Sequence, residues 1–109
     1  FARKHPEYDP YLFSTEKLLA DYQVDVFLWI SSFNPDKTPP ACKAPRIVIG
    51  HANMEAKDAD VFIPVGTPGI DHKGTMFRID GSVSLPLSQL RSSELPSLSE
   101  VMAAIEAAL

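Results

Sequence analysis

The chain has 109 residues, of which 45% are hydrophobic, and its formal net charge is −4. This length suits a single domain with a modest core, and the acidic balance with scattered basic residues argues against nucleic-acid binding. No apolar run is long enough to cross a membrane. The single cysteine, Cys42, excludes an internal disulfide framework and is compatible with the cytoplasm.

The first predicted elements are an arm and a short helix. Residues 1–12 hold two prolines and show no periodic pattern, so we expect them to form an irregular arm. A short helix follows, because the hydroxyl of Ser14 can accept backbone N–H groups of a first turn. This helix is expected to end near Tyr22.

Three apolar runs predict a small parallel sheet. They cover residues 24–30, 46–50 and 60–63, and they are rich in β-branched and aromatic side chains. The near-continuous apolarity of the first run predicts a central strand that is buried on both faces. The connection over 36–45 is too rich in proline for a helix, and residues 53–59 suit either one helical turn or a loop.

A hairpin is predicted next. The runs 77–79 and 83–85 flank an Asp-Gly-Ser turn. A two-residue turn would pair Arg78 with Val83, whereas a three-residue loop would pair Ile79 with Val83 and align the apolar side chains. Because register follows the buried face, the longer loop is favoured.

The C-terminal segment predicts an amphipathic helix. Ser97 and Glu100 have the spacing of a capping box. An apolar stripe runs along this helix. Its favoured role is to pack against the sheet, and the alternative is to bind a partner. The stripe consists of Leu98, Val101, Met102, Ile105 and Leu109. Together these elements predict an α/β fold: a small, mainly parallel three-layer sheet with a β-hairpin and a C-terminal amphipathic helix.

The sequence predicts neither a metal site nor a catalytic set. His5, His51 and His72 lack the spacing that places two ligands on one ion. Cys42 has no helix N-terminus or fixed base beside it that would lower its pKa, so it is interpreted as an incidental thiol.

Polar residues that follow the predicted strands are candidates for ligand binding. In open α/β sheets, ligands bind beyond the carboxyl ends of the strands, although no standard glycine-rich phosphate loop is present here. A plain turn at 31–35 and a solvated loop at 71–75 are equally compatible with the spacing alone. The candidates are Ser31, Ser32, Asn34, His51, Asp71, His72, Gly74 and Thr75.

Several stretches in order resemble a known family. Residues 26–35 run from a strand into Ser-Ser-Phe-Asn-Pro, residues 59–64 read Ala-Asp-Val-Phe-Ile-Pro, and residues 74–81 read Gly-Thr-Met-Phe-Arg-Ile-Asp-Gly. The order of these motifs resembles a run of motifs in molybdopterin oxidoreductases.

A closer resemblance is to the B subunit of formylmethanofuran dehydrogenase. The related B subunit of the formyltransferase/hydrolase complex of methylotrophic bacteria is similar as well. Residues 63–71 and 95–101 add to this signal, and the resemblance covers roughly residues 24–105.

The resemblance implies one-carbon metabolism in which formyl groups travel on methanofuran or a similar carrier. In the dehydrogenase, a molybdenum or tungsten pterin guanine dinucleotide carries the redox step. The metal ligand and iron–sulfur cysteines of that family lie upstream of the matching region, and Cys42 corresponds to neither. By similarity, the loop at 31–35 and the patch at 72–75 would lie near the pterin dinucleotide.

Two departures from the oxidoreductase pattern bear on whether the chain binds a pterin dinucleotide. Gly50 and His51 stand where many such oxidoreductases have an acidic residue and a proline, and residues 54–57 lack the usual threonine-rich turn. Both departures suit the B subunit of the formyltransferase/hydrolase complex.

The sequence is therefore expected to be the C-terminal domain, 1–109, of a larger cytoplasmic polypeptide, as a start at Phe1 also suggests. Its expected role is structural and assembly-forming. The expected partners are the rest of that polypeptide and the other subunits of the complex, with no cofactor in this part of the chain. Two alternatives remain open. One is a pterin dinucleotide-binding domain of an active oxidoreductase, and the other is a free-standing small-molecule binder, which would need Phe1 to be a natural start.

Overall fold

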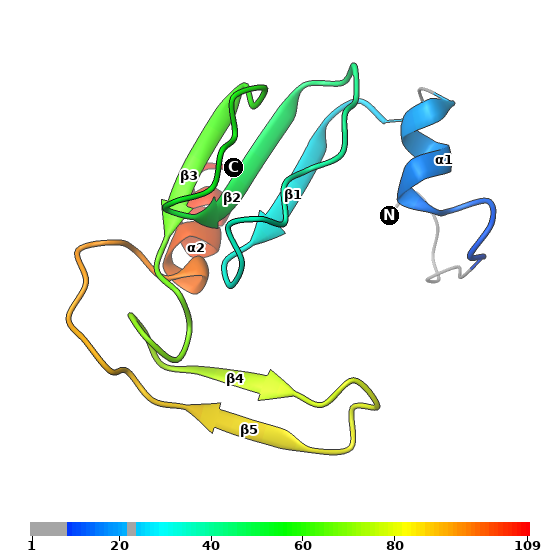
Figure 1. Ribbon diagram of the computed structural model, residues 1–109. Helices are drawn as coiled ribbons and strands as arrows, with labels where there is room; N and C mark the ends of the chain where they lie inside the picture. The colour runs from blue at the N-terminus through cyan, green and yellow to red at the C-terminus, as the bar shows by residue number, and fades with distance from the viewer. Residues whose placement is uncertain (1–8, 22–23) are drawn as a thin grey trace.

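The structure is a computed structural model that describes residues 9–21 and 24–109. His5, most of the predicted arm and the predicted helix end at Tyr22 lie outside the described residues. The elements in chain order are α1 (Thr15–Ala20), β1 (Phe27–Ser31), β2 (Arg46–His51), β3 (Val61–Val65), β4 (Gly74–Phe77), β5 (Ser84–Leu87) and α2 (Leu98–Ala108). A parallel sheet, an antiparallel hairpin and a C-terminal helix confirm the predicted α/β fold (Figure 1).

The three strands β1, β2 and β3 pair in parallel in that order. Ile49 of the middle strand is completely buried and pairs with Ile30 on one side and Ile63 on the other. The prediction that residues 24–30 form the central strand is wrong, because within the described residues β1 pairs with β2 alone. Its side chains alternate between half-buried and exposed, since the described residues leave one face of this edge strand partly uncovered.

Helix α2 packs on one face of the sheet, over β2 and β3 (Figure 1). The predicted capping box is confirmed: Ser97 Oγ accepts the Glu100 N–H, and the Glu100 carboxylate accepts the Ser97 N–H, both at 3.1 Å. The core consists of Ile49, Val65 and Val101, with Ile47, Ile63, Leu98 and Ile105 packed around them. The apolar stripe thus packs on the sheet as predicted, except that Met102 and Leu109 remain exposed.

The long connection between β1 and β2 lies on the opposite face of the sheet. Trp29 and Val48 pair across β1 and β2, and both side chains point to this face, away from α2. The Trp29 indole N–H donates to the Lys37 carbonyl oxygen at 2.9 Å, which ties the connection to the sheet. On the same face, Met54 is buried and closely covers Gly50, where a Cβ would lie 3.0 Å from the Met54 methyl carbon.

The hairpin of β4 and β5 extends away from the sheet (Figure 1). Met76 pairs with Leu85, and Arg78 N donates to the Val83 carbonyl oxygen at 2.9 Å, so the predicted longer-loop register is wrong. That prediction assumed a buried face, but nearly all hairpin side chains are exposed and no buried face selects the register. A polar turn sets it instead: Arg78 Nε donates to the Asp80 carboxylate at 2.9 Å.

Candidate functional site

The carboxyl ends of the three parallel strands form one edge of the sheet. Ser31 of β1 pairs with Gly50 of β2, which pairs with Pro64 of β3. This arrangement brings the predicted residues Ser31 and His51 to one edge, where Ser32 follows β1 directly. The loop over 66–73 leaves β3 at the same edge.

Asp71 is the most buried ionisable residue of this loop, with 2% of the residue exposed. One carboxylate oxygen accepts the Arg91 Nε–H at 2.6 Å, and the other accepts the Thr67 N–H at 2.8 Å. The Arg91 hydrogen bond, followed by the Thr67 N–H bond, holds the pKa of Asp71 below its ordinary value. Asp71 is therefore an ionised carboxylate with both oxygens engaged inside the chain.

Thr67 joins the loop after β3 to the residues after β1. Its hydroxyl donates to the Ser32 carbonyl oxygen at 3.4 Å, and both residues are buried. Buried polar groups in proteins are normally hydrogen-bonded, and this contact supplies a donor to the buried Ser32 carbonyl oxygen. At this point of the edge, the polar atoms therefore bond to groups of the chain itself.

His72 joins the same loop to the segment that precedes α2. Its Nε2 lies 2.7 Å from the Leu95 carbonyl oxygen, which requires the proton to be on Nε2. Next to it, Gly66 N donates to the Pro96 carbonyl oxygen at 2.9 Å. A Cβ on Gly66 would lie 2.5 Å from His72 Cδ2, so the imidazole packs directly on the glycine backbone.

The other candidates at the edge make short local bonds. Ser31 Oγ donates to the Asn34 carbonyl oxygen at 3.3 Å, and Asn34 Oδ1 accepts the Asp36 N–H at 2.8 Å. His51 Nδ1 accepts the Asn53 N–H at 3.0 Å. These bonds stabilise turns, as Asn and Ser often do after a strand.

Gly74 and Thr75 belong to the hairpin. Gly74 begins β4, and a Cβ there would lie 3.0 Å from Pro68 Cβ. Thr75 pairs with Pro86 and is exposed. The structure therefore separates Thr75 from the polar contacts at the sheet edge, while Asp71 and His72 lie within them.

No sequence pattern points to Arg91 or Thr67, although both hold Asp71. Arg91 lies 20 residues beyond Asp71, with a complete hairpin between them. No local spacing marks such a pair, because the hairpin has to form before the two side chains meet.

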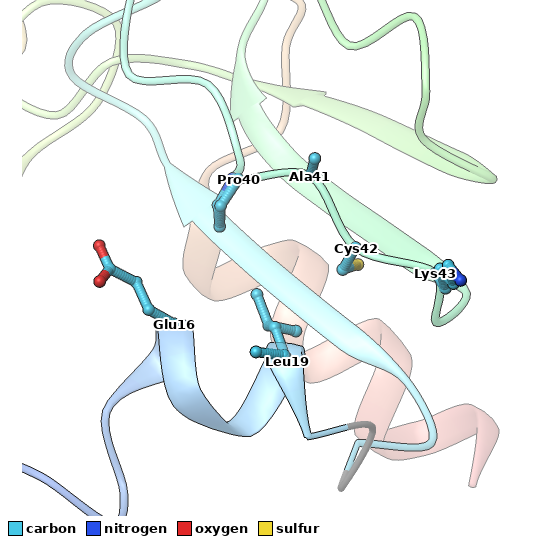
Figure 2. A pocket seen from close by; sticks show the side chains of 7 residues that line it. Glu16, Leu19, Pro40, Ala41, Cys42 and Lys43 are labelled. Atoms are coloured by element: carbon cyan, nitrogen blue, oxygen red, sulfur yellow. The ribbon is translucent and has the colours of Figure 1, made fainter.

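A hollow of about 480 Å³ lies between α1 and the connection to β2 (Figure 2). Its lining residues are Glu16, Leu19, Ala20, Pro40, Ala41, Cys42 and Lys43. The Cys42 thiol lies 3.5 Å from the Ala44 carbonyl oxygen, and no histidine is part of the described lining. The hollow is mainly apolar and does not supply the base that a cysteine nucleophile needs.

Two further properties concern the described part of the chain. Across residues 9–21 and 24–109, no three His, Cys, Asp or Glu residues are grouped so that they could hold a metal ion. Neither helix within these ranges has the length and apolarity that a membrane crossing requires.

The sequence matches no protein-family model, and a search of curated proteins finds no significant match. The structure is similar to a chain in the crystal structure of the formyltransferase/hydrolase complex FhcABCD from Methylorubrum extorquens in complex with methylofuran. The TM-score is 0.68 and the identity 22%, over 94% of this chain and 30% of that chain. At this identity the likeness shows a shared fold. It agrees with the predicted resemblance to such a complex, and this chain spans less than a third of the length of the chain it matches.

Proposed function

We propose that this chain is a structural, assembly-forming domain of the B subunit of a formyltransferase/hydrolase-type complex, with a role in formyl-carrier metabolism. The fold shared with a chain of such a complex supports this proposal. The observation that carries it is the apolar surface that the described residues leave uncovered.

The first part of this surface is the β1 side of the sheet. Leu28 and Ile30 pair with Ile47 and Ile49, so they point to the face on which α2 packs. Helix α2 covers β2 and β3 but leaves Leu28 44% exposed and Ile30 42% exposed. Parallel sheets are normally covered on both faces, so a further element is expected over β1.

The second part is the hairpin. Met76, Phe77 and Leu85 are exposed, and Ile79 at the turn is fully exposed. A two-stranded hairpin that packs on nothing is only marginally stable in water. A surface of another polypeptide that covers these side chains would stabilise it.

The polar edge of the sheet also favours assembly over cofactor binding. Both carboxylate oxygens of Asp71, the Thr67 hydroxyl and the His72 Nε2 bond to groups of this chain. A dinucleotide would have to replace these contacts before it could use the same atoms.

The alternative function is a molybdopterin or tungstopterin dinucleotide-binding domain of an active oxidoreductase. The observation in its favour is that Ser31 and His51 each end a strand at the carboxyl edge of a parallel sheet, where ligands bind in open α/β folds. His51 would approach the ligand through its Nε2, since its Nδ1 is engaged.

A binding experiment tests the assembly role. The tagged 109-residue chain is mixed with the remaining polypeptides of the complex from its own source, and the amount retained is measured. Leu28→Glu places a charge on the uncovered strip and should lower retention at least tenfold, whereas Gln89→Glu at an exposed loop position should not. Wild-type retention of the Leu28→Glu variant would contradict the proposal.

Metal analysis separates the two functions. The purified complex is assayed for molybdenum and tungsten, and for pterin released on denaturation. The assembly role predicts neither metal in stoichiometric amount, and a stoichiometric metal together with a pterin would favour the alternative.

A further inference from the structure

Arg46 is a buried cation without an anionic partner among the described residues. It begins β2, and only 8% of the residue is exposed. Its Nη2 donates to the Cys42 carbonyl oxygen at 3.2 Å, while its Nε is enclosed and has no hydrogen-bond partner in the described part of the chain. The Asp60 carboxylate accepts the backbone N–H of Arg46 at 2.7 Å, and no ion pair joins any described carboxylate to the guanidinium.

This situation is unusual for an arginine. Burying a charge is unfavourable unless it is paired and hydrogen-bonded. A guanidinium has five N–H donors in a planar fork that matches the two oxygens of a carboxylate. Within the described residues, the guanidinium of Arg46 donates one hydrogen bond, to a neutral carbonyl, and its Nε–H has no acceptor.

Arg46 also lines a hollow of about 260 Å³. The other lining residues are Thr38, Pro39, Glu55, Ala56, Lys57, Asp58 and Ala59. Thr38 offers a hydroxyl, and Lys57 is a second cation whose ammonium lies 3.7 Å from the Glu55 carboxylate. This hollow is separate from the carboxyl edge, because Arg46 lies at the opposite, amino end of β2.

We propose that the hollow beside Arg46 is a binding site for a small monocarboxylate anion. Because Nε is enclosed, the Nη–H groups of the guanidinium would donate to the carboxylate oxygens, and the Thr38 hydroxyl would donate a further hydrogen bond. Glu55 and Asp58 line the same hollow and repel any anion, but they repel a doubly charged anion such as hydrogen phosphate more strongly than a monocarboxylate. The site does not depend on the assembly role proposed above.

Titration of the 109-residue chain with sodium acetate, followed by amide NMR, tests the proposal. Saturable shifts are expected at Thr38 and at residues 56–59, beyond those seen with sodium chloride at equal ionic strength. Inorganic phosphate should bind more weakly. Acetate shifts no larger than those in chloride, or tighter binding of phosphate, would overturn the proposal.

Two variants locate the binding groups. Arg46→Lys keeps the charge but removes the fork, and it should weaken acetate about tenfold, as expected for the loss of one charge-assisted bond. Thr38→Val removes only the hydroxyl and should weaken acetate about fivefold, which keeps the test open if the Arg46 variant does not fold. Thr75→Val on the exposed hairpin is the matched control and should bind as the wild type does.

The chain's own carboxylates are the competing source of an anion. If the Asp58 side chain swings onto Arg46 in solution, the wild type would not bind acetate and Asp58→Asn would gain binding. That result would contradict a site for an external anion, whereas unchanged or modestly tighter acetate binding in Asp58→Asn supports it.

Discussion

Arg91 donates its Nε–H to the buried carboxylate of Asp71 at 2.6 Å and so joins the segment after β5 to the loop after β3. The two partners differ sharply in environment, since the Arg91 side chain is 67% exposed and that of Asp71 is 3% exposed. Solvent screens the arginine, so the geometry of the contact matters more than its charge. The contact fixes where the chain returns after the hairpin.

Removing the Asp71 charge should lower stability in a pH-dependent way. Because the folded-state pKa of Asp71 is below its ordinary value of 3.8, its contribution is complete above about pH 3.8 and is lost as the pH falls through the folded value. Asp71→Asn should therefore be less stable than the wild type at pH 7, and the two should converge in acid. Thermal unfolding between pH 7 and pH 2 checks this, with Glu106→Gln as control; a constant difference across that range would contradict it.

A side chain at Gly66 should dislodge His72. The new Cβ of Gly66→Ala would lie 2.5 Å from His72 Cδ2, so the imidazole has to leave the Leu95 carbonyl oxygen. The expected loss is about 1–3 kcal/mol in the free energy of unfolding, as for overpacked sites. Urea unfolding measures it. In a His72→Ala background the loss should shrink, and an unchanged loss would show that the clash lies elsewhere.

Two positions on the same sheet face should respond differently to truncation. Ile49→Ala empties a completely buried position and should cost about 2–5 kcal/mol. Leu28→Ala, on the uncovered edge strand, should cost less than about 1 kcal/mol in the isolated chain. Urea unfolding of both variants is the measurement, and equal losses would mean that β1 is covered in solution.

The hairpin turn should weaken when Gly81 gains a side chain. Gly81 has φ +72°, and a Cβ there would meet no described atom within 4 Å, so the cost is one of backbone conformation alone. For Gly81→Ala this cost is about 1–2 kcal/mol, which should lower hydrogen-exchange protection of the hairpin about 5–30-fold. Gly81→Asn, which tolerates this conformation better, should lose less protection. Protection in the sheet should not change.

Local sequence patterns predicted the helices and strands. The features that were predicted wrongly depend on contacts between residues far apart in the chain. The capping box of Ser97 and Glu100 lies within one helical turn, so it was predictable and is confirmed. The place of residues 24–30 in the sheet depends on how many strands lie beside them, which apolarity alone does not reveal. The hairpin register failed for a related reason, because the apolar side chains of residues 77–85 have no core to point to within the described structure.

In the candidate site, too, the residue types were predictable but their long-range partners were not. The residue types of Asp71 and His72 near a glycine predict a polar patch, and the structure does place them together after β3. Their partners Arg91 and Leu95 come from beyond the hairpin, so the sequence could not show that their polar atoms are engaged. Whether Ser31 and His51 bind a ligand stays a prediction.

The bonds that join Gly66 to Pro96 and Ile70 to Leu90 hold the two ends of the intervening segment next to each other. A segment whose ends already meet can be lengthened, shortened or exchanged without moving α2, since the closure cost grows slowly with length. A change in the length of this hairpin is therefore expected to leave the sheet and the helix in place. It is the natural place to graft a different contact surface when the chain is engineered for a new host assembly.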